Sequence, residues 1–223
     1  MADPSERNRQ PIIAIIPVGE LDEAKSRLGA VLDAEERLEL SVGMARRTIA
    51  AAVAATRIAE VLVITPDDTV RALATELGAR AILQRDSGLN HGIVAARAEA
   101  LAAGAGAILI LPIDLPEVTA DAIDAVAATA DDPRRPLVTI VRDRHRRGTN
   151  ALLIAPPAAI DVCFGGDSAI AHAAAARTLG ARLVELDGPL VLDLDTPDDL
   201  LLAEASLRGF DAAAHAGEPV DVG

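Results

Sequence analysis

Short apolar runs that alternate with helical patterns constrain the fold of this 223-residue chain more than any other feature. Residues 12–17 (IIAIIP), 61–65 (VLVIT) and 107–112 (AILILP) contain no charged side chain. Continuous hydrophobic runs of this length are typical of strands in a parallel sheet, because helices cover both faces of such a sheet. The sequence therefore predicts an α/β fold with a Rossmann-like sheet that is flanked by helices.

The segments between these runs continue the alternation. A further strand is expected over 79–84, and helices are expected over 34–56, from the PDD tripeptide at 66–68 to Leu77, and over 91–103. Another helix begins after Thr119, whose hydroxyl is suited to cap it.

The pattern changes after residue 136. Strands are expected over 136–141 and 150–155, with a strongly charged loop between them, and a helix runs from Ser168 to Gly180. The predicted strands 182–186 and 190–194 lie so close in sequence that part of this half should be antiparallel, which makes the sheet mixed and mostly parallel. A helix over 197–208 ends the fold. We predict one domain over 1–223, with flexible tails at 1–10 and 210–223.

Composition excludes several functions. A net charge of −13 disfavours a protein that binds nucleic-acid backbones, and an aromatic content of 1% leaves no platforms on which bases could stack. No apolar run reaches the roughly 18 residues of a membrane span, and the polar N-terminus lacks the apolar segment of a signal peptide. Cys163 is the single cysteine, so we expect no internal disulfide and a small buried residue. The expected location is the cytoplasm, with no membrane or nucleic-acid partner.

The loop after the first strand is the first candidate for chemistry, since ligands of open α/β sheets bind beyond the carboxyl ends of the strands. This loop, PVGELDEAKSRLG, contains Lys25 and Arg27. Lysine offers phosphate a compact charge, and arginine offers it a fork of donors. Lys25 is also the only lysine, against twenty arginines, so its presence here is unusual for this chain. The alternative is a solvated surface loop.

Acidic residues follow two other predicted strands. Asp114 comes after the run 107–112, between two prolines, and Asp193 and Asp195 lie at the end of the run 190–194. Mg²⁺ takes one or two carboxylates together with phosphate oxygens of a substrate, so these residues are candidate ligands. The alternatives are turn residues or helix caps, and Asp198 and Asp199 suit the helix start that Thr196-Pro197 indicates.

Three further loops carry weaker signals. The segment RDRHRRGTN (142–150) holds four arginines, which either attract a polyanion or form a solvated hairpin tip. FGGDS (164–168) places two glycines before a helix whose N-cap is Ser168 or Asp167, and amides there bind phosphate or carboxylate. GLNHGI (88–93) is a similar helix entry, in which Asn90 either contacts a base edge or caps the helix.

Common catalytic patterns are absent from the sequence. Cys163 has no nearby base, the spacing of zinc ligands is missing, and neither GxGxxG after the first strand nor a Walker motif is present. A loop that binds phosphate, an acidic metal site and an arginine cluster remain. This set suits nucleotidyl transfer, which depends on positioning and neutralisation of charge.

The motifs IIPVGELDEAKSRL, GLNHGI, LPIDLP, RRGTNALLIAPP, FGGDS and LDLDTPDDL occur in one order along the chain. In these motifs the chain resembles the guanylyltransferases of coenzyme F420 biosynthesis, over about residues 11–208. These are the 2-phospho-L-lactate guanylyltransferases and their bacterial relatives that use phosphoenolpyruvate. The resemblance implies a fold similar to nucleotide-diphospho-sugar transferases and a reaction in which GTP and the phospho-acid give a guanylylated product and diphosphate, with Mg²⁺.

The resemblance also assigns roles to residues. Lys25 and Arg27 would hold the GTP phosphates, and Asp114 would hold Mg²⁺ together with Asp193 or Asp195. The phosphorylated acid would be bound by Thr149, Gly165 and Ser168. The nucleotide would also lie against Pro17 and against the loop formed by Gly88, Leu89 and Asn90.

One departure from the family pattern affects these assignments. The family usually has a lysine directly after Ile-Pro-Val, where this chain has Gly19. Two alternatives therefore stay open: another nucleotidyltransferase of the same fold, for example of the molybdenum cofactor type, and a nucleotide-binding regulator without catalysis. The sequence does not choose among phosphoenolpyruvate, 2-phospho-L-lactate and 3-phosphoglycerate, and it leaves a homodimer open.

Overall fold

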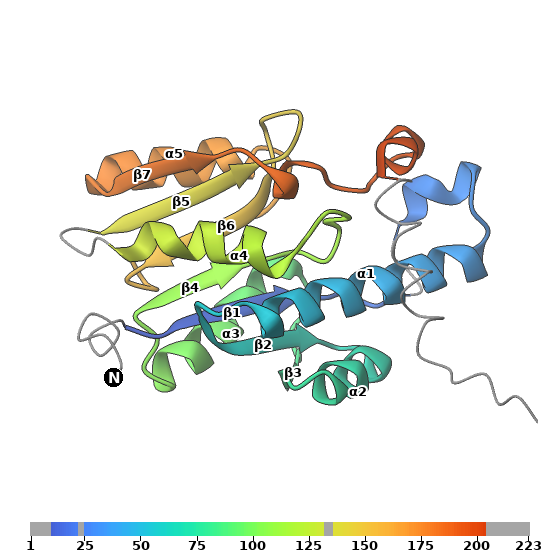
Figure 1. Ribbon diagram of the computed structural model, residues 1–223, viewed down its shortest axis with the longest axis horizontal. Helices are drawn as coiled ribbons and strands as arrows, with labels where there is room; N and C mark the ends of the chain where they lie inside the picture. The colour runs from blue at the N-terminus through green and yellow to red at the C-terminus, as the bar shows by residue number, and fades with distance from the viewer. Residues whose placement is uncertain (1–9, 22–24, 132–135, 204–223) are drawn as a thin grey trace, which may run out of the picture.

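The three apolar runs form neighbouring strands of a seven-stranded sheet in the computed structural model, which describes residues 10–21, 25–131 and 136–203 (Figure 1). The order across the sheet is β3-β2-β1-β4-β6-β5-β7. The strands are β1 (Ile12–Pro17), β2 (Ile58–Thr65), β3 (Arg80–Leu83), β4 (Ala107–Ile110), β5 (Leu137–Arg142), β6 (Thr149–Ala155) and β7 (Arg182–Leu186). The tails predicted at 1–10 and 210–223 lie outside the described residues, apart from residue 10, and so does the predicted helix beyond residue 203.

The sheet is mixed and mostly parallel, as the sequence predicts. β6 is antiparallel to both of its neighbours, β4 and β5, whereas the other pairs are parallel. The strand predicted over 190–194 is wrong, because the chain forms the short 3-10 helix η4 (Pro189–Val191) and then continues without strand structure. The Asn150 amide donates to the carbonyls of Leu190 and Val191 (both 3.0 Å), so these groups are taken by a side chain and not by a neighbouring strand.

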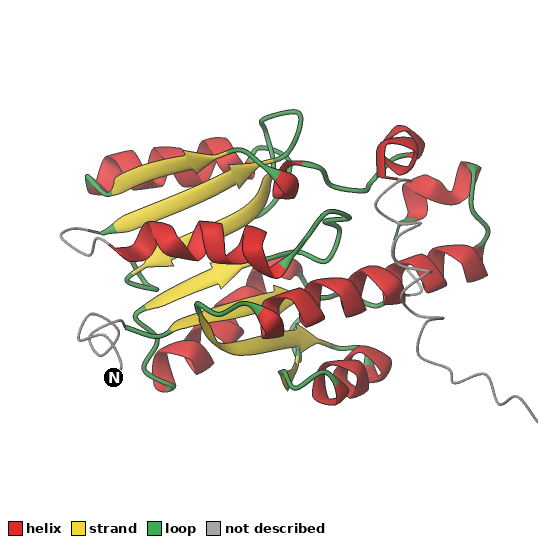
Figure 2. Cartoon of the chain, in the orientation of Figure 1, coloured by secondary structure: helices red, strands yellow, loops and turns green. Residues whose placement is uncertain are grey.

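Helices cover both faces of the sheet (Figures 1 and 2). One face carries α1 (Ala34–Ala54), α2 (Asp68–Glu76) and α4 (Ala120–Ala127), and the other carries α3 (Leu89–Ala102) and α5 (Ser168–Leu179). Residues of β1 alternate between the two cores: Ile12 and Ala14 pack on the first face, and Ile13 and Ile15 on the second. Both cores consist of Ala, Leu, Ile and Val, since the chain has almost no aromatic residues.

Local capping fixes where the helices begin. Thr119 accepts a hydrogen bond from the amide of Ala122, which confirms the predicted start of α4. Asp33 and Glu36 form a reciprocal capping box at the start of α1. None of the described helices is long and apolar enough to span a membrane.

The strand directions determine where a site can form. The carboxyl ends of the parallel strands β1 and β4 lie at one edge of the sheet, and the antiparallel β6 begins at that same edge. The loops at this edge include η2 (Ser26–Ala30), which follows β1 after residues 22–24, and the segment after η4. Residues far apart in the sequence therefore meet there.

Candidate functional site

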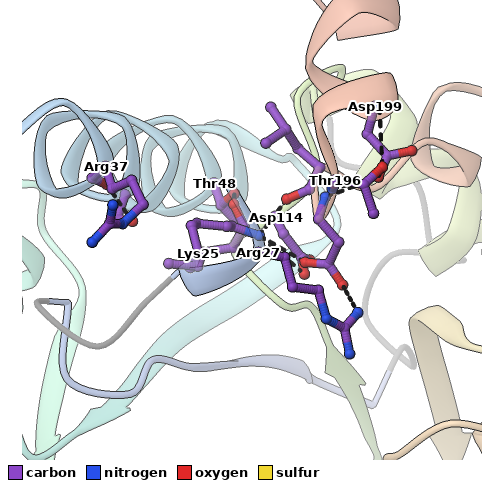
Figure 3. Close-up of polar contacts among 11 residues, drawn as sticks. Lys25, Arg27, Arg37, Thr48, Asp114, Thr196 and Asp199 are labelled. Atoms are coloured by element: carbon purple, nitrogen blue, oxygen red, sulfur yellow. Dashed lines mark hydrogen bonds and ion pairs between the residues drawn. The ribbon is translucent and has the colours of Figure 1, made fainter. Parts of the chain in front are cut away.

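Lys25 lies at the centre of a polar cluster at the ends of β1 and β4. It directly precedes η2, with its backbone in the left-handed region (φ 56°). Its ammonium donates to the Leu194 carbonyl (2.5 Å) and to Oδ1 of Asp195 (3.1 Å), and it lies 3.6 Å from Oδ2 of Asp114. Figure 3 shows the side chain pointing toward Asp114. Only 8% of it is exposed, so carboxylates and a carbonyl surround the charge in place of water.

In the part of the chain that the structure describes, the three carboxylates of this cluster outnumber the two cations that pair with them. Oδ1 of Asp114 and Oδ1 of Asp193 are buried, and neither accepts a hydrogen bond within the part of the chain that the structure describes. Burial raises the pKa of Asp114, against the opposing effect of Lys25, and the charge of Asp195 raises it further. Burial and the charges of Asp114 and Asp195 raise the pKa of Asp193 to about 6. The structure thus gathers all three predicted metal ligands in one place.

The carboxylate oxygens of this cluster fit a magnesium ion that is also bound by a substrate. The two buried oxygens without partners are the type of ligand that Mg²⁺ prefers. No set of three or more His, Cys, Asp or Glu side chains converges as a metal cage among residues 10–21, 25–131 and 136–203. Oxygens from a substrate would therefore have to complete the coordination, as is common for Mg²⁺ bound with phosphates.

A cavity of about 390 Å³ opens beside the cluster. Its lining consists of residues 17–21 and 112–114 together with Lys25 and Asp195, so the predicted nucleotide contact Pro17 borders it. Arg27 lies on the solvent side of the cluster and does not line the cavity: its side chain is 75% exposed and lies 3.8 Å from Asp195. Gly19 also lines the cavity, and a Cβ added there would meet no atom within 4 Å. The position where the family usually carries lysine is therefore open.

Asp199 fixes the backbone around Asp195. Its Oδ2 accepts hydrogen bonds from the amides of Asp195 (3.1 Å) and Thr196 (2.8 Å) and from the Thr196 hydroxyl (2.7 Å; Figure 3). Its Oδ1 pairs with Arg144 at 2.7 Å. The expected helix-start role of Asp199 is confirmed, but its hold on Asp195 was missed. The TPDD sequence signals a cap, and nothing in it signals this second contact.

A second group surrounds Thr149, one of the three residues assigned to the phospho-acid. The Thr149 hydroxyl lies 3.1 Å from Nδ1 of His172, which is completely buried. Nε2 of His172 accepts a hydrogen bond from the amide of Cys163 (3.0 Å). The prediction that Cys163 is buried is wrong, because its side chain is exposed and its backbone makes the structural contact. Sequence reasoning did not identify His172 at all.

The start of α3, where Leu89 and Asn90 are already helical, is joined to the loop that precedes α5. Asn90 donates from its amide to the Phe164 carbonyl (3.0 Å) and accepts from the Phe164 amide (2.8 Å), so it clamps the two segments together. Gly88 has φ 99° and Gly165 has φ 154°, conformations that favour glycine. The N-cap of α5 is Asp167, but its carboxylate pairs with Arg147 (2.7 Å) and does not cap the helix.

Ser168 is buried at the start of α5, and two amides there already have partners. The Ser168 amide donates to the Gly165 carbonyl (3.1 Å), and the Ala169 amide donates to the Arg147 carbonyl (2.9 Å). Thr149, Gly165 and Ser168 therefore lie on three adjacent segments. Asn150, next to Thr149, links this group to the acidic cluster, because it holds the backbone of η4.

The arginine cluster at 142–147 is paired with acids. Arg142 forms a fork with Glu185 (3.0 and 2.7 Å), and Arg146 lies 3.4 Å from Asp187. Arg144 pairs with Asp199, and Arg147 pairs with Asp167. The cluster therefore braces the β5–β6 loop against neighbouring segments, which agrees with the alternative of a hairpin with alternating charges.

Comparisons with known proteins identify the family of this chain. The sequence model of the "Guanylyl transferase CofC like" family matches residues 12–216. The chain belongs to this family. A phosphoenolpyruvate guanylyltransferase of Sphaerobacter thermophilus is 43% identical to it over 189 residues, covering 84% of this chain and 90% of the relative. Another of that name, from Rubrobacter xylanophilus, is 42% identical and covers 87% of this chain and 94% of the relative.

Solved structures confirm the fold. A protein described as a nucleotide-diphospho-sugar transferase from Desulfovibrio desulfuricans superposes with a TM-score of 0.71 at 15% identity, over 92% of this chain and 96% of that one. A nucleotidyl transferase from Methanothermobacter gives 0.63 at 16% identity, over 90% and 100%. The predicted likeness to nucleotide-diphospho-sugar transferases is therefore correct.

Proposed function

We propose that this guanylyl transferase-like protein joins GMP from GTP to phosphoenolpyruvate and releases diphosphate, as a step of coenzyme F420 biosynthesis. Its family and the names of relatives that are more than 40% identical support the reaction. The single observation that carries the proposal is the cluster of Lys25 with three carboxylates beside an open cavity at the carboxyl edge of the sheet. Such a cluster suits the binding of a nucleoside triphosphate with a divalent cation.

Asp114 and Asp193 would hold Mg²⁺, since each has a buried oxygen that no described residue hydrogen-bonds. Asp195 is already engaged by Lys25 at 3.1 Å and is 3.8 Å from Arg27, which suits it to orient these cations. When bound, Mg²⁺ would neutralise charge on the α-phosphate and on the leaving diphosphate. Arg27, which is mostly exposed, would reach the outer phosphates of GTP.

The chemistry needs no general base from the protein. The phosphate oxygen of the acid is already anionic, so it attacks the α-phosphorus of GTP directly. As the new P–O bond forms, the bond from the α-phosphorus to the bridging oxygen breaks, and diphosphate leaves with that electron pair. Lys25 would neutralise the negative charge near the α-phosphate, where the attacking oxygen and the leaving oxygen lie. Rigid positioning of the two substrates would supply the remaining catalysis.

Thr149, Gly165 and Ser168 would bind the phospho-acid, and the start of α3 at Gly88, Leu89 and Asn90 would lie near guanine or ribose. The two hydrogen bonds between Asn90 and Phe164 support this arrangement, because they keep the start of α3 beside the loop that contains Gly165. Asn150 supports it as well, since it ties the start of β6 to the segment that leads to Asp193.

A screen of nucleotides against acceptors tests the proposal. Purified protein and Mg²⁺ are incubated with each of GTP, ATP, CTP and UTP and with phosphoenolpyruvate, 2-phospho-L-lactate or 3-phosphoglycerate. Diphosphate release and product mass are measured. We expect the highest rate with GTP and phosphoenolpyruvate, and a product with the mass of their GMP adduct. A faster reaction with another nucleotide or acceptor would contradict the assignment, and GTP binding without diphosphate release would indicate a regulator.

A further inference from the structure

His172 connects the three segments that carry the proposed acid contacts. It lies on α5 one turn after Ser168, so both side chains are on one side of that helix. It bonds the Cys163 amide (3.0 Å), next to the Phe164-Gly165 loop, and the Thr149 hydroxyl (3.1 Å) at the start of β6. Its ring also meets the Phe164 ring edge-on, with centroids 5.2 Å apart.

The partners of His172 determine its tautomer. A backbone amide can only donate, so Nε2, which faces the Cys163 amide, carries no hydrogen. The single hydrogen of a neutral imidazole is then on Nδ1, which donates to the Thr149 hydroxyl oxygen. Burial lowers the pKa of His172 to about 4, so the ring is neutral at the pH of the cell interior.

This direction of hydrogen bonding constrains Thr149. Its oxygen accepts from His172, so its own hydrogen remains to be donated elsewhere. Among the described residues, His172 is the only side chain that bonds the hydroxyl. An anionic oxygen of phosphate or carboxylate is an acceptor only, and a hydrogen bond to a charged acceptor is stronger than one between neutral groups.

We propose that His172 is a positioning residue, which orients the Thr149 hydroxyl as a donor to an anionic oxygen of the phospho-acid. The inference rests on the proposed function, because it takes Thr149 as a contact to the acid. The competing explanation is a histidine that only stabilises the core through Cys163 and Phe164.

Two amide substitutions separate these roles, since each retains one of the two contacts. In His172→Asn the amide nitrogen can take the place of Nδ1 and keep the bond to Thr149. In His172→Gln the longer side chain brings its amide oxygen to the place of Nε2 and keeps the bond to the Cys163 amide. Thr149→Val removes the hydroxyl at nearly constant volume, and Thr139→Val is a matched control at a buried threonine on β5.

The measurements are KM for phosphoenolpyruvate, KM for GTP, kcat and the melting temperature of each variant. We expect His172→Gln and Thr149→Val to raise KM for phosphoenolpyruvate about tenfold or more, since each loses a hydrogen bond to a charged group. KM for GTP should stay within about twofold. His172→Asn should keep a low KM for the acid even where its melting temperature falls. The KM for phosphoenolpyruvate of the double variant His172→Gln/Thr149→Val should be no higher than that of Thr149→Val alone, because both changes act on the same hydrogen bond.

The reverse order, with His172→Asn impaired and His172→Gln normal, would overturn the proposal, and so would additive effects in the double variant. Calorimetric titration with phosphoenolpyruvate, in the presence of a non-hydrolysable GTP analogue, gives a readout that does not depend on turnover. If the wild-type chain transfers no GMP but binds the acid more tightly than His172→Gln does, the proposed function fails and the positioning role stands. Equal affinities of the wild type and His172→Gln would refute the role itself.

Discussion

Replacing Lys25 by methionine should both destabilise the fold and stop turnover. Methionine keeps the length and the apolar stem of the side chain but removes the charge. The ammonium now lies 3.1 Å from a carboxylate oxygen of Asp195 and 3.6 Å from one of Asp114. Without it, these carboxylates face each other and Asp193 with no enclosed cation among the described residues around them.

The distances set the size of the effect. At an effective dielectric constant of about 20, each of these two ion pairs has a Coulomb energy of about 5 kcal/mol. The carboxylates are partly exposed, at 25% for Asp114 and 41% for Asp195, and burial of the ammonium costs solvation energy. We therefore expect a net loss of about 3 kcal/mol in the free energy of unfolding, the lower end for the removal of one partner from a buried pair.

The loss should depend on pH. Burial already raises the pKa of Asp114, Lys25 opposes this, and the substitution therefore raises that pKa further. A carboxyl whose folded pKa is raised destabilises the protein once pH rises through that pKa. The difference between variant and wild type should consequently be larger at pH 8 than at pH 5, which is below the pKa of about 6 of Asp193.

Urea denaturation at both pH values measures the stability, and diphosphate release measures the activity. Arg46→Met is the matched control, because Arg46 forms an exposed pair with Glu76 at 3.0 Å, and such surface pairs contribute about 0–1 kcal/mol. The reasoning is refuted if Lys25→Met loses less than about 1 kcal/mol, shows the same loss at pH 5 and pH 8, and releases diphosphate at the normal rate.

Four further results are expected. Asp114→Asn should lower diphosphate release by at least about 100-fold while the circular dichroism spectrum stays unchanged, and near-normal turnover would exclude Asp114 as a metal ligand. Ser168→Ala should mainly raise KM for the acid, and an unchanged KM would argue against its placement. Because the pKa of His172 is lowered from 6.5 to about 4, protonation of this side chain in the unfolded chain should remove up to about 3 kcal/mol of stability between pH 6.5 and pH 4. The carboxyl groups whose pKa is raised act in the opposite direction, so the stability of the wild type is compared with that of His172→Asn in urea titrations, and a difference that stays constant with pH would contradict the buried neutral ring. Gly19→Lys should fold as well as the wild type, since its Cβ meets nothing within 4 Å, and should lower KM for GTP; an unchanged KM would mean that this position does not reach the phosphates.

The hydrophobic pattern predicted the central strands well, but it wrongly predicted a strand over 190–194. β1, β2 and β4 are buried on both faces, so their apolar runs are unambiguous. The run at 190–194 looks similar, and Leu190 and Leu194 are indeed buried. Burial does not require strand pairing, however, and the Asn150 amide takes the carbonyls that a neighbouring strand would have used. That contact joins residues 40 positions apart, which no local pattern contains.

The site was predictable where its residues follow strands, and not where they act through other residues. Lys25 and Asp114 were identified because they come after β1 and β4, whose carboxyl ends share an edge of the sheet. His172 sits within an alanine-rich helix and does not stand out in the sequence, and Asp199 is recognisable there only as part of a helix start. The bond of His172 to Thr149 and the pairing of Asp199 with Arg144 join residues far apart in the sequence, which only the folded chain brings near.

The antiparallel direction of β6 explains how one strand serves both halves of the site. A parallel strand would bring its carboxyl end to this edge, but β6 begins there with Thr149 and Asn150. The pairing of β6 with β5 is irregular here, because Val141 pairs with Ala151 and Arg142 with Thr149, which leaves Asn150 without an opposite residue on β5. Thr149 bonds His172 on the face covered by α5, and Asn150 bonds the backbone of η4, whose Leu190 packs in the opposite core together with Ala151. Strict alternation from Ala151 would exchange the directions of Thr149 and Asn150 and would break both contacts, so this irregularity couples the acid contacts to the carboxylate cluster.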